Sequence, residues 1–105
     1  MQVHEDVIQD LLRDMARNRN TVQCLDEQII KLIARRMLYA FRIGKAKRDL
    51  GMDVFIQEVR EANLRKMMLI AKEEGVSETL IDFIYQGIYA QADKEQEEDK
   101  GRNCN

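Results

Sequence analysis

The sequence predicts an all-α fold, with three helices per chain, one very long and two shorter, in an intertwined helical homodimer. Three observations favour this class. None of the 105 residues is proline, so nothing forces a break in the long amino-terminal segment. Apolar residues recur at intervals of three and four, which is the period of one buried helical face. Glycine-containing turns interrupt this pattern near residues 51 and 75.

The first helix is predicted from about residue 6 to residue 49. Its apolar positions form one stripe: Ile8, Leu11, Met15, Val22, Leu25, Ile29, Leu32, Ala40 and Ile43. The segment "RNRN", residues 17–20, has low helix propensity because of its asparagines, so a helix broken there is an open alternative.

Two turns separate the remaining helices. Gly51 in "DLGMD" predicts the end of the first helix, and a second helix is expected over residues 54–74. Gly75 and Ser77 in "EGVSETLID" indicate the next helix end and helix start. We expect one domain over residues 1–98, followed by a disordered polar tail at residues 99–105.

The helix lengths predict the dimer. A helix of about 40 residues is roughly 60 Å long, and helices of about 20 residues cover only about half of that length. Two chains could cover each other if their long helices ran side by side and the shorter helices wrapped the partner. The alternative is a looser bundle with a broken first helix.

Composition limits the function classes. The net charge is -2, with no overall basic excess, so we expect no nucleic-acid or membrane binding. The first residues lack an export signal, which predicts a cytoplasmic location. The single histidine and two cysteines make no metal-binding pattern, and there is no phosphate loop or catalytic triad. We therefore expect neither a metal nor a cofactor.

Cations interrupt the apolar stripes. Arg36 and Lys47 fall within about 20° of the centre of the first stripe, and Arg60 repeats at helical spacing with apolar residues of the second helix. An unpaired cation in a dry core costs several kcal/mol, so each of these cations needs an anion. These side chains either extend to water and pair with Glu58 and Glu61, or form a pocket for a small dianion.

The segment "LDEQIIKLIARRMLYAFRIGKAK" resembles the opening of the all-helical class of chorismate mutases, and the likeness extends from about Arg19 to Gln96. The loop between Lys47 and Arg60 is longer by one residue than in that pattern. The residues that match the family at its spacing are Arg19, Arg36, Lys47, Arg60, Glu61 and Gln96. The resemblance implies an intertwined dimer with two identical pockets.

The resemblance also implies a reaction and a set of roles. Chorismate, a dicarboxylate, would rearrange to prephenate in phenylalanine and tyrosine biosynthesis by a pericyclic shift that needs no nucleophile. Arg36 of one chain, together with Arg19 of the partner subunit, would hold the two carboxylates. Arg60 would add a positive electrostatic field at the site. Lys47 and Gln96 would hydrogen-bond the ether oxygen, where negative charge grows. For Gln96, a surface position in the polar tail is an alternative.

Gln57 departs from the family pattern, in which many members carry an aspartate three residues before the arginine of the second helix. Glu61 would accept a hydrogen bond from the ring hydroxyl and favours a mutase. An isochorismate-pyruvate lyase and an amino-deoxychorismate mutase remain alternatives on the same fold. A third alternative is a non-catalytic helical dimer that binds a small dicarboxylate or a partner protein.

Overall fold

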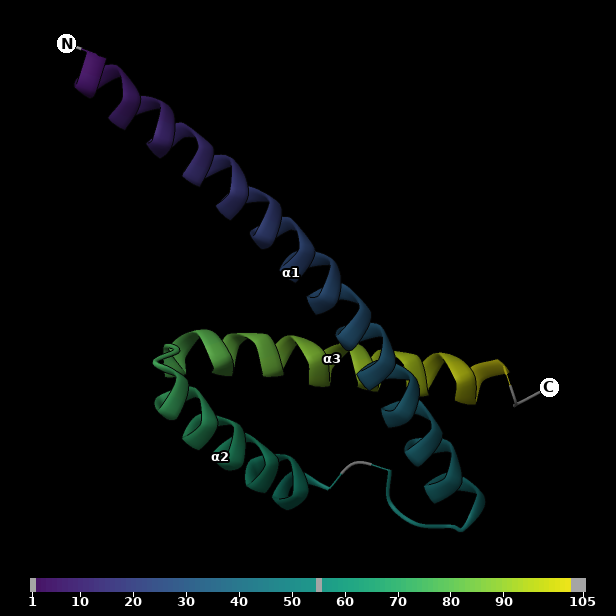
Figure 1. Ribbon diagram of the computed structural model, residues 1–105. Helices are drawn as coiled ribbons and strands as arrows, with labels where there is room; N and C mark the ends of the chain where they lie inside the picture. Colours follow the sequence, from purple (N-terminus) through teal and green to yellow (C-terminus); the bar gives the residue numbers. More distant parts are fainter. Residues whose placement is uncertain (1, 55, 103–105) are drawn as a thin grey trace. The chain divides into compact units, whose positions relative to one another are not determined.

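The computed structural model describes residues 2–54 and 56–102, which form three α-helices and no strand (Figure 1). Helix α1 spans Gln2–Asp49, α2 spans Gln57–Glu74 and α3 spans Glu78–Arg102. The predicted all-α class and the order of one very long and two shorter helices are confirmed.

Helix α1 has 48 residues and continues without interruption through residues 17–20. The predicted alternative of a helix that breaks at this segment is therefore wrong. Local side-chain bonds explain why the asparagines are tolerated. Asn18 Nδ2 donates to Asp14 Oδ2 at 3.4 Å, and Thr21 Oγ1 donates to the carbonyl oxygen of Arg17 at 3.1 Å. Both bonds join residues one turn apart and stay within the helix.

The connection between α1 and α2 follows Asp49 and contains Gly51, which the sequence predicted as the signal for the helix end. The φ of Gly51, 71°, lies in the left-handed region that glycine adopts without steric cost. Helix α2 then starts at Gln57, later than the predicted residue 54. Ile56 precedes the helix in an extended conformation, with φ −127° and ψ 111°, and its side chain makes no capping hydrogen bond.

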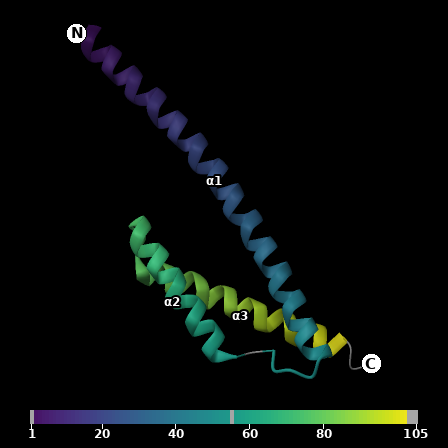
Figure 2. The same cartoon turned by 60° about the horizontal axis from the view of Figure 1, so that its bottom comes forward.

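Helices α2 and α3 form a hairpin that both views show (Figures 1 and 2). Gly75 ends α2 in the left-handed conformation, and its N–H donates to Lys72 O at 3.3 Å. Ser77 caps α3, because the Leu80 N–H donates to Ser77 Oγ at 3.3 Å. Helix α3 runs to Arg102, so residues 99–102, predicted to belong to a disordered tail, are helical. The rest of that predicted tail, residues 103–105, lies outside the described residues.

The chain divides into two units, residues 1–36 and 37–105. In the first unit, every side chain over residues 4–35 is exposed, including Leu11 at 59% and Ile30 at 67%. In the second unit, Ala71 and Tyr89 are the buried residues of α2 and α3, at 4% and 9% exposure. A single chain therefore leaves much of its apolar surface open to water. None of the described helices is long and apolar enough to cross a membrane.

Candidate functional site

A pocket with a volume of about 270 Å³ opens between α2 and α3 in the second unit. Its apolar wall consists of Leu64 and Ala90 together with the Tyr89 ring. Its polar wall contains one guanidinium, two carboxylates and two amides: Arg60, Glu61, Asp93, Gln57 and Gln86. Three of the predicted site residues, Gln57, Arg60 and Glu61, thus meet at one pocket. They do so because they lie within the first turns of α2, on the side that faces α3.

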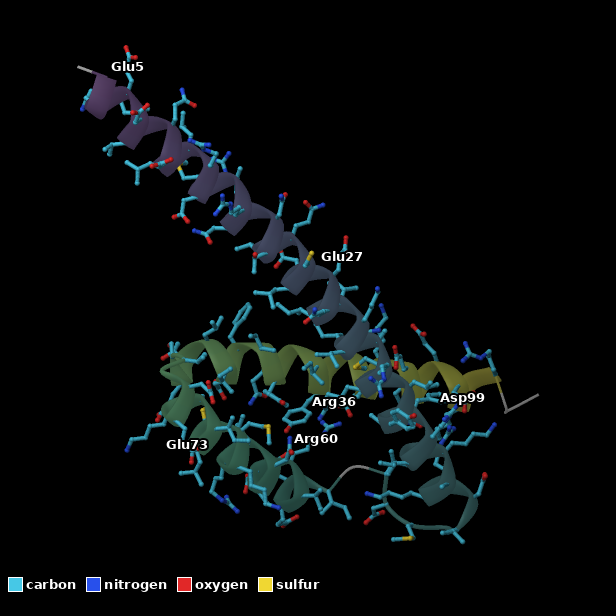
Figure 3. All side chains as sticks on the ribbon, viewed as in Figure 1. Glu5, Glu27, Arg36, Arg60, Glu73 and Asp99 are labelled. Carbon is cyan, nitrogen blue, oxygen red and sulfur yellow. The ribbon has the colours of Figure 1, made fainter. Side chains whose placement is uncertain are left out.

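Arg60 is held at this pocket by two kinds of contact. Its Nη1 donates to Asp93 Oδ2 at 3.0 Å and its Nη2 to Asp93 Oδ1 at 2.7 Å, which makes a bidentate pair. The guanidinium carbon also lies 4.7 Å from the centre of the Tyr89 ring. Figure 3 shows Arg60 directed from α2 toward α3. Glu58 and Glu61 were the expected ion-pair partners of the inward cations, but the bidentate partner of Arg60 is Asp93.

Tyr89 fixes the surface on which Arg60 lies. Asn63 Nδ2 donates to the Tyr89 hydroxyl oxygen at 2.9 Å, and the hydroxyl donates to Arg60 O at 3.3 Å. The Tyr85 and Tyr89 rings are 5.9 Å apart in a tilted arrangement. Because Tyr89 is buried and both hydrogen-bonding functions of its hydroxyl are used, the ring is a rigid support for the guanidinium.

Glu61 and Gln57 lie one turn apart at the start of α2. Gln57 Nε2 donates to Glu61 Oε1 at 3.1 Å, and both side chains are exposed. The amide at position 57 therefore orients the carboxylate of Glu61 without adding a charge of its own.

Gln96 is part-buried against the end of α1, in the second unit. Its Nε2 donates to Phe41 O at 3.2 Å, and its Oε1 is buried without a hydrogen-bond partner among the described residues. A Cβ at Gly44 would lie 2.1 Å from Gln96 Nε2, so glycine is required for this close approach. Lys47 follows Gly44 by three residues on the same helix face and is half-buried. The fold therefore brings Gln96 to the face of α1 that carries Lys47.

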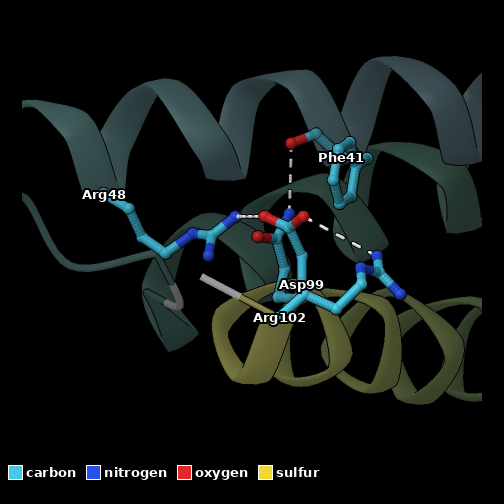
Figure 4. A network of polar contacts seen from close by, with 5 residues as sticks. Phe41, Arg48, Asp99 and Arg102 are labelled. Atoms are coloured by element: carbon cyan, nitrogen blue, oxygen red, sulfur yellow. Dashed lines mark hydrogen bonds and ion pairs between the residues drawn. The ribbon is translucent and has the colours of Figure 1, made fainter. Parts of the chain in front are cut away.

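An ion-pair cluster of Arg48, Asp99 and Arg102 joins the ends of α1 and α3 (Figure 4). Arg48 Nη2 donates to Asp99 Oδ2, and Arg102 Nη2 lies 3.6 Å from Asp99 Oδ1. The hydrogen bond from Arg48 is the largest cause that lowers the pKa of Asp99, while partial desolvation acts in the opposite direction. The charges of Arg48, Lys45 and Arg102 lower this pKa further.

Arg19 and Arg36 belong to the first unit, where Arg19 is exposed and Arg36 is half-buried. Their place in a common site with Lys47 and Arg60 stays a prediction.

Sequence reasoning missed the carboxylate of Asp93 and its pairing with Arg60. A signal for it exists, because Asp93 follows Tyr89 by four residues and so shares its helix face. The polar composition from Asp93 onward had pointed instead to a solvated segment.

Comparison with known proteins identifies the relatives of this chain. The family model for chorismate mutase type II matches residues 18–97, a range that contains all seven predicted site residues. Among curated proteins, the T-protein of Haemophilus influenzae is 30% identical over 73 residues, which are 70% of this chain and 19% of that protein. The chain thus spans about a fifth of the length of this relative. No solved structure gives a significant match.

Proposed function

Because the chain belongs to the chorismate mutase type II family, we propose that it is a cytoplasmic enzyme that rearranges chorismate to prephenate. The observation that carries the proposal is the family match over residues 18–97, which includes every candidate site residue. The pocket between α2 and α3, where Gln57, Arg60 and Glu61 meet, supports it.

The proposed reaction does not require any group of the protein to react. In chorismate the ether C–O bond breaks while a new C–C bond forms, so the electrons move within one cyclic transition state. No atom is transferred to or from the protein. Catalysis then consists of holding the substrate in its reactive shape and stabilising the charge that grows on the ether oxygen.

Arginines are proposed to hold the two substrate carboxylates. Arg36 and Arg19 of the partner subunit would bind them, because a guanidinium matches a carboxylate with two parallel hydrogen bonds. Arg60, fixed on the Tyr89 ring, would add positive field at the same pocket.

Lys47 and Gln96 are proposed to stabilise the ether oxygen. The Gln96 amide nitrogen carries two hydrogens, and only one is needed for the bond to Phe41 O. This bond anchors the amide, and the second hydrogen remains for the substrate. Lys47 would supply a full charge, which strengthens its hydrogen bond as negative charge develops.

Glu61 is proposed to accept a hydrogen bond from the substrate hydroxyl. Gln57 donates to Glu61 Oε1 and leaves the other carboxylate oxygen for the ligand. Because Gln57 is neutral, recognition of the hydroxyl would depend on Glu61 alone. Isochorismate or an amine-bearing substrate would present a different group to Glu61 at the same place. The product of the reaction must therefore be identified to show which substrate the protein uses.

We also propose the intertwined homodimer. Its support is the large apolar surface that one chain leaves exposed along α1: Val7, Ile8, Leu11, Leu12, Met15, Val22, Leu25, Ile29, Ile30, Leu32, Ile33, Leu38 and Ile43. Exposed apolar surface of this extent marks an interaction site. A second copy would bury it against its own α1, with its α2 and α3 covering the remainder.

The test is to add chorismate to the purified protein, follow its loss and identify the product. Prephenate is the expected result. Salicylate with pyruvate would instead indicate the lyase, and an amino product from amino-deoxychorismate would indicate the corresponding mutase. Binding of the substrate without turnover would leave a non-catalytic dicarboxylate-binding dimer.

A further inference from the structure

The Arg60–Asp93 pair occupies the pocket that a dianionic substrate is proposed to enter. Both residues line the pocket between α2 and α3. The two Arg60–Asp93 hydrogen bonds, 3.0 Å and 2.7 Å long, use the Nη1 and Nη2 ends of the guanidinium together. This edge is one that a ligand carboxylate would use for bidentate binding.

The charges around the pocket make this arrangement unfavourable for a dianion. Arg60 supplies one positive charge, whereas Glu61 and Asp93 supply two negative ones. A ligand carboxylate that approached Arg60 while Asp93 kept its bonds would be repelled by a like charge at short range. For the ligand to use this cation, Asp93 has to release it.

Asp93 is the partner that can move. The Arg60 side chain is 21% exposed and lies on the buried Tyr89 ring, whereas the Asp93 side chain is 52% exposed. On release, the Asp93 carboxylate could turn into water and be solvated there. Arg60 would stay on the tyrosine, ready to bind the incoming carboxylate.

We propose that Asp93 is an affinity-determining residue that competes with a substrate carboxylate for Arg60, which would contact that carboxylate in addition to the arginine proposed above to hold it. The proposal rests on the proposed function to the extent that the ligand is a dicarboxylate. Asp93 thereby raises the apparent dissociation constant for every ligand that needs Arg60, and a ligand with fewer negative charges is penalised less.

The size of the effect follows from the fraction of molecules in which Arg60 is released. A pair that is closed in about nine of ten molecules raises the apparent Kd about tenfold. Because Asp93 is half-exposed and water screens the pair, we expect a factor between about threefold and tenfold.

The experiment compares Asp93→Asn with wild type and with Glu98→Gln, which removes one negative charge from an exposed position on the same helix. The Kd for isophthalate, a rigid dicarboxylate that cannot rearrange, is measured by calorimetry, and KM for chorismate by turnover. Asp93→Asn should lower both constants by about threefold to tenfold, with Glu98→Gln unchanged. Circular dichroism establishes that each variant is folded.

An Arg60→Gln, Asp93→Asn double variant separates competition for Arg60 from general charge repulsion. If Asp93 acts through Arg60, its substitution should no longer increase affinity in the Arg60→Gln background. An equal increase in both backgrounds, an unchanged or higher Kd for Asp93→Asn, or no isophthalate binding by any variant would overturn the proposal. Failure of the wild type to convert chorismate would contradict the proposed function but would leave the calorimetric comparison decisive.

Discussion

At the scale of single residues, Gln96 lies against Gly44 in the space that a larger residue at that position would fill. An added Cβ at Gly44 would lie 2.1 Å from Gln96 Nε2 and 2.5 Å from Gln96 Cδ. The group that must move is the end of a flexible side chain. The cost of the substitution should therefore appear in the position of Gln96 more than in the stability of the fold.

Gly44→Ala is expected to lower the turnover number and leave the protein folded. Alanine favours the helix over glycine by about 1 kcal/mol, which offsets the cost of moving the amide. If Gln96 donates to the ether oxygen, its displacement should lower kcat on the order of ten- to a hundredfold. Steady-state kinetics and thermal unfolding measure the two effects separately.

The Gly44→Ala, Gln96→Ala double variant is the control, since it restores space while removing the amide. Its kcat should equal that of Gln96→Ala alone. Wild-type turnover by Gly44→Ala would show that the observed position of Gln96 is not needed for catalysis.

Lys47→Ala tests the second proposed donor. Lys47 is half-buried, and no carboxylate is paired with its ammonium among the described residues. Its loss should lower kcat on the order of a hundredfold or more, because the stabilised charge exists mainly in the transition state. The melting temperature should stay constant or rise, because an inward charge without a protein partner is removed.

Lys45→Ala, an exposed cation two residues away, is the matched control and should change kcat little. Equal effects of the two substitutions would assign Lys47 to general electrostatics instead of direct contact with the substrate.

At the scale of elements, Asp99 joins the end of α3 to the end of α1 through Arg48. The hydrogen bond from Arg48, followed by nearby positive charges, holds the pKa of Asp99 below its ordinary range, against the effect of desolvation. A lowered folded-state pKa means that the ionised carboxylate stabilises the fold. That contribution is complete above the unfolded-state pKa and is lost as the pH falls through the folded-state pKa.

Asp99→Asn should therefore destabilise the protein near neutral pH, and the difference from wild type should shrink below about pH 4. Denaturant midpoints measured across the acid range, with Glu98→Gln as the control, give this dependence. A stability difference that stays constant down to about pH 2 would mean that the packing of Asp99, and not its charge, is responsible.

The helix ends show which parts of the fold were predictable. Gly51, Gly75 and Ser77 act through their own backbone or hydroxyl group, so their effect is readable in a short stretch of sequence. The start of α2 and the extension of α3 to Arg102 were harder to predict from the sequence. Ile56 offers no capping side chain, and residues 99–102 look like a solvated run until Asp99 is seen to pair with Arg48 across 51 positions.

The candidate site was also predictable from the sequence only in part. Periodicity placed Arg60 on the inner face of the second helix, and the pocket there is lined by Gln57, Arg60 and Glu61 together. Periodicity did not reveal that Asp93 would be the partner of Arg60. That pairing depends on how α2 and α3 face each other, which no spacing within one helix determines.

At the scale of the whole molecule, the proposed dimer follows from the imbalance between α1 and the other helices. A 48-residue helix extends for roughly 72 Å, whereas α2, with 18 residues, extends for about 27 Å. The remaining apolar surface needs a cover that one chain does not contain. In the proposed dimer, each active site would draw on both chains.

The sharpest test of that arrangement uses Arg19 and Lys47. In a straight α-helix, residues 28 positions apart are separated by roughly 42 Å, so Arg19 and Lys47 of one such helix would not reach the same small ligand. In an antiparallel pair of α1 helices, each pocket would contain Lys47 from one chain and Arg19 of the partner subunit. Arg19→Ala and Lys47→Ala homodimers should then both be nearly inactive.

Mixing the two variants should restore activity. In a heterodimer one pocket collects both substitutions, and the other contains neither. Random reassociation makes about half of the dimers mixed, so about a quarter of the wild-type sites should reappear after the two variants are refolded together. Turnover of the co-refolded sample, compared with each variant refolded alone, measures this recovery. Verified heterodimers that stay inactive, although each variant folds, would rule out a pocket shared between chains.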